Sequence, residues 1–316
     1  MIVRITIIAL LLLCSCSPIE SEKPLRVGFN PWPGYEFIYL AEKKGFYQQQ
    51  GISVRLVELN SLGDVRRAFE RGQIDIMAST MVELLIATEN TGRSINIIAV
   101  ADASNGSDML LAPKSTNSLH ELKGKAIGVE GGTVDILVAN AALASAGLSF
   151  QDVKVVGKTQ DDLVADIEGG LIDAIQTYPP YSVRLLNTGK YQRLFDTSMI
   201  PGVIVDILSA DTDVIKKRED DIQRFLTAYF QAFEYFEKHP KVSSEIMGKR
   251  VGLSGEEFFE TTQGMIIFNR DAQAPYLNPD SKGGVALNNA ATALYNTGWL
   301  KNTINVEDFF TNPNLN

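Results

Sequence analysis

The chain has 316 residues, of which 45% are hydrophobic, and its 38 acidic and 29 basic side chains give a net charge of −9. Binding of a nucleic-acid backbone needs clustered Lys and Arg, whereas the basic groups here are short and dispersed, so this acidic chain is not predicted to bind nucleic acid. The length exceeds a typical single domain of about 100–150 residues and predicts two domains.

The first residues have the features of a secretory signal. Arg4 precedes an apolar run at Ile5–Leu13, which leads into Leu13-Cys14-Ser15-Cys16. This run is far shorter than the ~20 residues that cross a bilayer, and Leu-x-Ser-Cys resembles a bacterial lipobox. We therefore predict a signal peptide at 1–15, lipidation of Cys16 and a tether at 16–24. The alternative is an ordinary cleavage site and a released protein; in either case the loss of Arg4 changes the net charge to −10.

The stretch 25–39 predicts a strand, a turn and the start of a helix. Apolar residues at every second position from Leu25 to Phe29 indicate a half-buried strand, and Asn30–Gly34 ends it with two prolines and a glycine. Ligands dock at the carboxyl ends of strands in open α/β sheets, so Trp32, Tyr35 and Glu36 are candidate ligand residues. An aromatic platform beside a carboxylate suits a ligand with a cationic or flat part. The alternative is a core Trp and a helix-capping Glu.

Strands and helices alternate in the next part of the chain. Ser79 and Thr80 end one of these strands at the same edge as Trp32, where their hydroxyls could contact a ligand or cap the following helix. A polar loop, Asp102–Asp108, then precedes an apolar run at Met109–Ala112 that we take as the end of the first domain, and Asp108 is expected near a hinge. The predicted strands are 51–57, 72–78 and 95–101, and the predicted helices are 35–44, 64–70 and 81–89.

A second unit is predicted from Pro113 onwards. Its strand Ala126–Glu130 passes through Gly131-Gly132-Thr133 into an apolar helix at Val134–Ala146. Such a helix start leaves backbone N–H groups free for an anion or a carboxylate, which makes Gly132 and Thr133 candidate ligand residues. No phosphate-binding Gly-Lys-Ser/Thr and no dinucleotide glycine pattern follows, so nucleotide binding is not predicted.

The second unit ends in two tyrosines that flank a diproline turn. Tyr178 and Tyr181 follow the strand Leu171–Gln176 and either reach a cleft from its far side or pack locally. A further apolar strand at Pro201–Ala210 is expected to cross back to the first unit, which places Asp206 near the hinge. Aromatic residues at helical spacing within 220–238 predict a core-facing stripe. The remaining predicted elements are strand 153–156 and helices 161–168, 244–251, 255–263 and 285–296.

Several of these segments together resemble bacterial solute-binding proteins of ABC importers, in the group that handles nitrate, sulfonates, taurine and thiamine-pyrimidine precursors. The segments are Asn30–Glu36, Gly72–Ile76, Gly128–Val134 and Gly170–Ile175 with Pro180-Tyr181. The resemblance implies an α/β type II periplasmic-binding-protein fold, in which two three-layer lobes joined by a two-strand hinge close over a ligand. It divides the chain into lobe 1 (25–112 and 206–316) and lobe 2 (113–205). Many relatives have Trp-Glu-Pro-Tyr where this chain has Tyr178-Pro-Pro-Tyr181, a change that removes an acid.

This resemblance implies a periplasmic or cell-surface lipoprotein that delivers a small polar solute to an ABC permease and ATPase. Carboxylates and aromatic rings favour a cation and the Gly131-Gly132 helix start favours an anion, so an aminosulfonate zwitterion is the first expectation and a neutral pyrimidine the second. We expect a monomer that is not an enzyme and has no cofactor or metal. One alternative is a ligand sensor that reports to a membrane signalling protein. Another is a pyrimidine-synthase-like enzyme, but that chemistry uses a cysteine cluster and histidine, whereas Cys16 is the only mature thiol and His120 and His239 are far apart in sequence.

Overall fold

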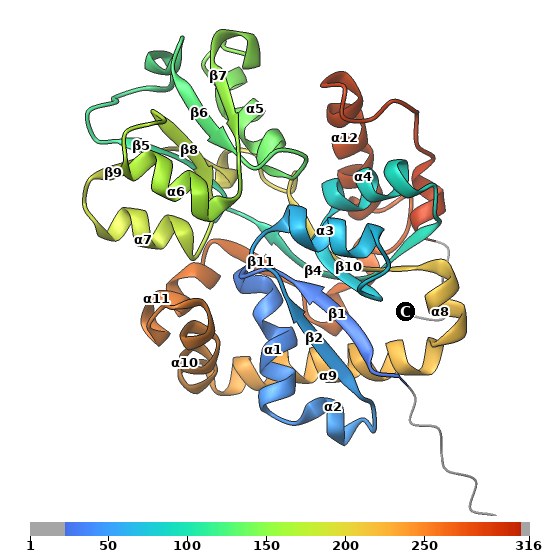
Figure 1. Cartoon of the computed structure of the whole chain (residues 1–316). Helices are drawn as coiled ribbons and strands as arrows, with labels where there is room; N and C mark the ends of the chain where they lie inside the picture. Colours follow the sequence, from blue (N-terminus) through green and yellow to red (C-terminus); the bar gives the residue numbers. More distant parts are fainter. Residues whose placement is uncertain (1–22, 311–316) are drawn as a thin grey trace, which may run out of the picture.

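The computed structural model describes residues 23–310, and the predicted signal peptide and Cys16 lie outside them. Figure 1 shows two lobes, each built around its own sheet. The larger sheet, in lobe 1, has the strand order β11 (Met265–Ile267), β4 (Ile95–Ser104), β10 (Val205–Asp211), β3 (Ile76–Thr80), β1 (Leu25–Phe29) and β2 (Val54–Glu58). The sheet of lobe 2 has the order β7 (Lys154–Gly157), β6 (Ala126–Val129), β8 (Ala174–Thr177), β5 (Met109–Pro113) and β9 (Tyr191–Asp196).

Both sheets combine parallel and antiparallel pairs in the same way. In lobe 1, β1 lies parallel to β2 and β3, whereas β10 runs antiparallel to β3 and β4. In lobe 2, β6 lies parallel to β7 and β8, whereas β5 runs antiparallel to β8 and β9. In each sheet one antiparallel strand, β10 or β5, is the first strand after the chain has crossed over from the other lobe. This arrangement confirms the predicted bilobal α/β fold.

Helices cover both faces of the sheets. Lobe 1 has α1 (Glu36–Lys43), α2 (Phe46–Gln49), α3 (Leu62–Glu70), α4 (Met81–Thr91), α8 (Thr212–Lys217), α9 (Glu219–Lys238), α10 (Pro240–Val251), α11 (Gly255–Thr262) and α12 (Lys282–Asn296), and lobe 2 has α5 (Asp135–Ser145), α6 (Gln160–Glu168) and α7 (Tyr181–Asn187). The predicted aromatic stripe of α9 is confirmed, because Phe37 of α1 packs edge-on against Tyr229, Phe233 and Phe236. None of the helices within 23–310 is long and apolar enough to cross a membrane.

The chain passes between the lobes twice, and the two crossovers lie side by side. Met109–Pro113 pairs with β8 and β9, so its assignment to lobe 1 is corrected and the first crossover is the segment 105–108. Thr197, in the second crossover, accepts a hydrogen bond from Gly106 N at 2.8 Å through Oγ1, which also lies 2.7 Å from Ser104 Oγ. Thr197 N donates in turn to Asp108 O at 3.0 Å. Two short, mutually bonded segments therefore form the connection about which the lobes can rotate.

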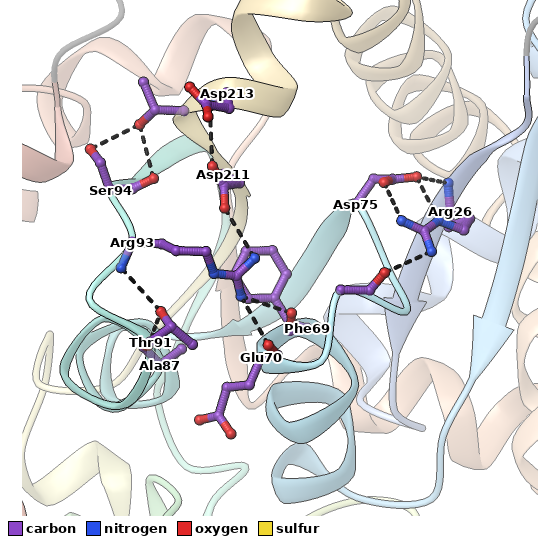
Figure 2. Close-up of polar contacts among 12 residues, drawn as sticks. Arg26, Phe69, Glu70, Asp75, Ala87, Thr91, Arg93, Ser94, Asp211 and Asp213 are labelled. Atoms are coloured by element: carbon purple, nitrogen blue, oxygen red, sulfur yellow. Dashed lines mark hydrogen bonds and ion pairs between the residues drawn. The ribbon is translucent and has the colours of Figure 1, made fainter.

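Arginine side chains fix the end of the lobe 1 sheet that is opposite the crossovers (Figure 2). Arg26 donates from Nη2 to Asp75 Oδ1 at 2.6 Å and from Nη1 to Gly72 O at 2.8 Å. Arg93 joins Asp211 Oδ2 at 3.0 Å to the carbonyl of Phe69 at 2.9 Å. Each arginine donates to acceptors from two separate segments at once, because its planar guanidinium group carries several N–H donors. This end of the sheet is therefore braced by structural pairs.

Candidate functional site

A small cavity lies between the lobes at the carboxyl ends of β1, β3 and β8. It is lined by Asn30, Trp32, Leu62, Thr80, Asp108, Val134, Tyr178, Ile204 and Asp206, which come from both lobes and both crossovers. The cavity volume, measured as the space available to the centre of a water-sized sphere, is about 10 Å³. This is close to the space that one water molecule needs. A larger hollow of about 1060 Å³ is lined by Lys23, Arg26, Lys216 and other residues of lobe 1 alone, so it is no interlobe site.

Direct contacts between the lobes account for the small volume of this cavity. Glu130 Oε1 of lobe 2 accepts from Gly63 N at 2.9 Å, and Glu83 Oε1 of lobe 1 accepts from Val134 N at 2.8 Å. The Tyr181 hydroxyl donates to Asn60 O at 3.1 Å. The structure is therefore the closed form, and a solute larger than water requires the lobes to separate first.

Aromatic side chains of the first lobe donate to two of the buried acids. Trp32 Nε1 donates to Asp102 Oδ2 at 3.1 Å, and the Tyr35 hydroxyl donates to Asp206 Oδ1 at 2.5 Å. Burial and the neighbouring Asp206 raise the pKa of Tyr35 well above its usual value, so the phenol keeps its proton as a donor. The Trp32 ring packs edge-on against Tyr178 with centroids 5.9 Å apart. Two aromatic groups of lobe 1 thus hold carboxylates at the cavity, and a tyrosine of lobe 2 packs against one of these rings.

The carboxyl groups around the cavity form an acid cluster, each member at most 4% exposed. Its members are Glu83, Asp102, Asp108, Glu130, Asp135 and Asp206. Burial raises the pKa of Asp102, Asp108 and Glu130 to about 7. Burial also raises the pKa of Glu83, Asp135 and Asp206, and nearby acids add to the shift of Asp135 and Asp206. Each of these groups is charged less readily than in water because little positive charge compensates it. Within 23–310, no three His, Cys, Asp or Glu side chains are grouped as a metal site.

Part of the sequence-derived site is brought together at the cavity. Trp32, Thr80, Asp108, Tyr178 and Asp206 all line it, and Tyr35 reaches it through Asp206. Thr80 also caps α4, since its side chain accepts from Val82 N, so both of its proposed roles fit the structure.

Other residues of the sequence-derived site have partners outside the cavity lining. Glu36 is fully buried but faces Arg250, whose Nε donates to Glu36 Oε2 at 2.5 Å, so its assignment to the ligand site is corrected. Ser79 donates to Thr80 O at 3.2 Å and Thr133 donates to Glu130 O at 2.7 Å. Ser79 and Thr133 are thus engaged within their own turns, whereas Glu36 is engaged by a distant helix.

The start of the second-lobe helix, where the sequence predicts an anion site, is occupied in this closed form by a side chain of lobe 1. The Val134 N–H is taken by Glu83 from the other lobe, and Gly132 lies against the indole of Trp299. Gly132 has a φ of +75°, a left-handed conformation that favours glycine. A protein carboxylate thus occupies the place where a solute anion was expected.

Sequence reasoning missed several residues of this region. The sequence predicts a turn at Asn30 and a loop at Asp102, but β4 continues to Ser104 and so carries Asp102 inside the sheet. Glu83 stands three residues after Thr80, and this capping-box spacing was the available signal. Glu130 and Asp135 flank the Gly131-Gly132 turn, and Asp135 is buried because it accepts from Glu130 N at 2.9 Å.

Several known proteins are similar to this chain in sequence or in structure. A binding protein of Brucella abortus is 23% identical over 245 residues, covering 72% of this chain and 71% of that protein. The alkanesulfonate-binding protein SsuA from Xanthomonas axonopodis pv. citri bound to MOPS is 18% identical, with a TM-score of 0.76 over 90% of this chain and 96% of that chain. The nitrate-binding protein NrtA from Synechocystis PCC 6803 is 14% identical, with a TM-score of 0.73 over 90% and 84%.

One enzyme has a similar fold, the desulfurization enzyme DSZB, with 14% identity and a TM-score of 0.70 over 93% of this chain and 97% of that chain. These structural similarities identify the fold, which is that of periplasmic solute-binding proteins. The family model described as NMT1/THI5 like matches residues 32–243, a span that includes most of the cavity lining and both crossovers. The chain therefore belongs to the NMT1/THI5-like family.

Proposed function

We propose that this protein is an extracytoplasmic solute-binding lipoprotein that delivers a small polar solute to an ABC importer. One observation carries the proposal: side chains from both lobes and both crossovers converge on a small cavity at the ends of the strands. A ligand held there contacts both lobes only when they are closed, so it shifts the population towards the closed form. The output is a change of shape that a membrane permease can recognise.

The proposed ligand residues are Trp32, Thr80, Asp108, Tyr178 and Asp206, together with Asn30 from the same lining. The aminosulfonate, nitrate-like anion and pyrimidine precursor expected from the sequence are the candidate solutes. Cys16 is the proposed site of lipid attachment, which would hold the protein at a membrane surface outside the cytoplasm.

Scattering on the mature protein tests this function. Native mass spectrometry of protein purified from its source identifies a co-purified solute, and small-angle scattering is then recorded with that solute and after its removal. We expect the radius of gyration to fall when the solute is added back, because the lobes close around it. Superimposable profiles, or a solute that is recovered chemically changed, would contradict a carrier role.

A further inference from the structure

The polar lining of the cavity presents unpaired hydrogen-bond acceptors. Asn30 Oδ1, Asp108 Oδ2 and Asp206 Oδ2 have no partner in good hydrogen-bond geometry among the described residues, although Gln176 lies beside Asp108 and Asp102 beside Asp206, and these side chains are at most 2% exposed. All three residues line the same cavity and come from different segments of the chain. Buried acceptors are normally paired. One water fits the closed cavity, and when the lobes separate the same acceptors face an entering solute.

The donors of the lining side chains are mostly used by the protein, and outside the lining Gln176 Nε2, beside Asp108, is a buried donor without a partner. Thr80 Oγ1 donates to Glu83 Oε2 at 2.6 Å, and Trp32 Nε1 donates to Asp102 at 3.1 Å. Tyr178 accepts from Asn30 Nδ2 at 3.4 Å, which leaves its own phenolic proton for a neighbour or a ligand. The site therefore has more acceptors to offer a solute than donors.

The charged side chains around the cavity are carboxylates, which carry the same negative charge as an oxyanion. No Lys or Arg occurs among the described residues that line it. Two cations lie on α3: Arg67 pairs with Asp64, and Arg66 pairs with Glu70 through Nη1 while its buried Nε has no partner. A nitrate or sulfonate group in the cavity would thus lose its hydration beside buried acids without a Lys or Arg in the cavity lining.

We propose that the solute is a small organic cation with at least two N–H donors, of the ammonium, amidinium or guanidinium type. Asp108, Asp206 and Asn30 accept its N–H groups, and Trp32 and Tyr178 offer it their ring faces or edges. This inference rests on the proposed function and names the chemical class of its solute.

The protonation of the cavity supports this class of ligand. Burial raises the pKa of Asp108 to about 7, and a bound cation favours its charged form. Binding of a cation therefore releases protons and strengthens as pH rises through 7. The titratable groups that face this site are Tyr35, Glu83, Asp102, Asp108, Glu130, Asp135, Tyr178, Asp206 and Tyr229.

Calorimetry with small probe molecules tests the class directly. The mature protein, freed of co-purified solute by unfolding and refolding, is titrated with acetamidinium, methylguanidinium and ethylammonium chlorides, and with taurine, sodium ethanesulfonate and sodium nitrate. We expect binding of at least one of the three cations at pH 8, with affinity about tenfold or more lower at pH 6. Failure of all three cations to bind at 10 mM overturns the inference, and so does binding that strengthens at pH 6.

Two variants connect binding to the proposed acceptors. Asp108→Asn and Asp206→Asn are expected to lower the affinity for the bound cation by about 10- to 100-fold, since each removes a charge-assisted hydrogen bond. The same variants should raise the melting temperature of the empty protein, because each removes a buried charge that lacks compensation. Asp280→Asn, an exposed acid outside the cavity lining, is the matched control and should change neither quantity. Unchanged affinity in both cavity variants contradicts the inference.

The outcomes separate this inference from the function on which it rests. If ethanesulfonate or nitrate binds and compacts the protein in small-angle scattering while the cations do not, the carrier function stands and the cationic class is wrong. If the co-purified solute is a cation but leaves the scattering profile unchanged, the carrier function fails while the chemistry of the cavity stands.

Discussion

Trp32 combines a packing role with a hydrogen-bonding role at the cavity. Its indole N–H donates to Asp102, and its ring packs against Tyr178 of the other lobe. Trp32→Phe keeps an aromatic ring but leaves a buried carboxyl group without this donor. We expect the free energy of unfolding to fall by about 1–3 kcal/mol, measured by urea denaturation at pH 8.

The chain offers a matched control for this variant in its second tryptophan. Trp299 is 41% exposed, and Trp299→Phe should change the free energy of unfolding by no more than about 0.5 kcal/mol. Equal losses in the two variants would mean that ring size, and not the hydrogen bond to Asp102, sets the effect.

At the scale of elements, the paired crossovers depend on a single hydroxyl. Thr197 Oγ1 is bonded to Gly106 N of the other crossover and to Ser104 Oγ at the end of β4. Thr197→Val keeps the side-chain shape but leaves these buried or half-buried groups without their partner. We expect a loss of about 1–3 kcal/mol in the free energy of unfolding and faster amide hydrogen exchange at 104–108, measured by mass spectrometry.

Thr188→Val is the control for the crossover variant. Thr188 Oγ1 donates to Leu185 O at 2.7 Å at the C-terminal end of α7, outside both crossovers. This substitution should leave exchange at 104–108 unchanged. Faster exchange there in both variants would argue against a specific role for Thr197.

The sequence predicts the elements of this fold better than it predicts the site. Period-two apolar runs and cap residues mark strands and helices locally, so β1, α3, α5 and α9 were found within a few residues of their bounds. Which way a polar side chain faces depends on distant partners. Glu36 turns to Arg250, 214 residues away, whereas Asp102 is drawn into the sheet by β10 and β11, which pair with β4 from later in the chain. Such pairings have no signal in the local pattern.

The whole molecule should be more stable in mild acid than in mild base. Burial raises the pKa of Asp102 and Asp108 from 3.8, and that of Glu130 from 4.5, to about 7. At a pH between the ordinary and the raised pKa of these groups, the folded state binds more protons than the unfolded state. The free energy of unfolding therefore decreases as pH rises, and this decrease is complete above about pH 7. Urea denaturation of the empty protein at pH 5.5 and pH 8 measures this difference.

The acid cluster is the expected source of this pH dependence. Asp108→Asn should reduce the difference in unfolding free energy between pH 5.5 and pH 8, whereas Asp280→Asn should retain it. A free energy of unfolding that increases from pH 5.5 to pH 8 would show that paired surface acids, such as Asp75 beside Arg26, outweigh the buried ones.

The acid cluster draws its members from both sides of the cleft: Glu83, Asp102 and Asp206 belong to lobe 1, and Glu130 and Asp135 belong to lobe 2. Closing an empty, ionised cleft therefore brings like charges together where water no longer screens them. A bound cation removes that repulsion, so the lobes close more readily around a ligand than around an empty cavity. An importer that accepts only the closed form would then hydrolyse little ATP on the ligand-free protein.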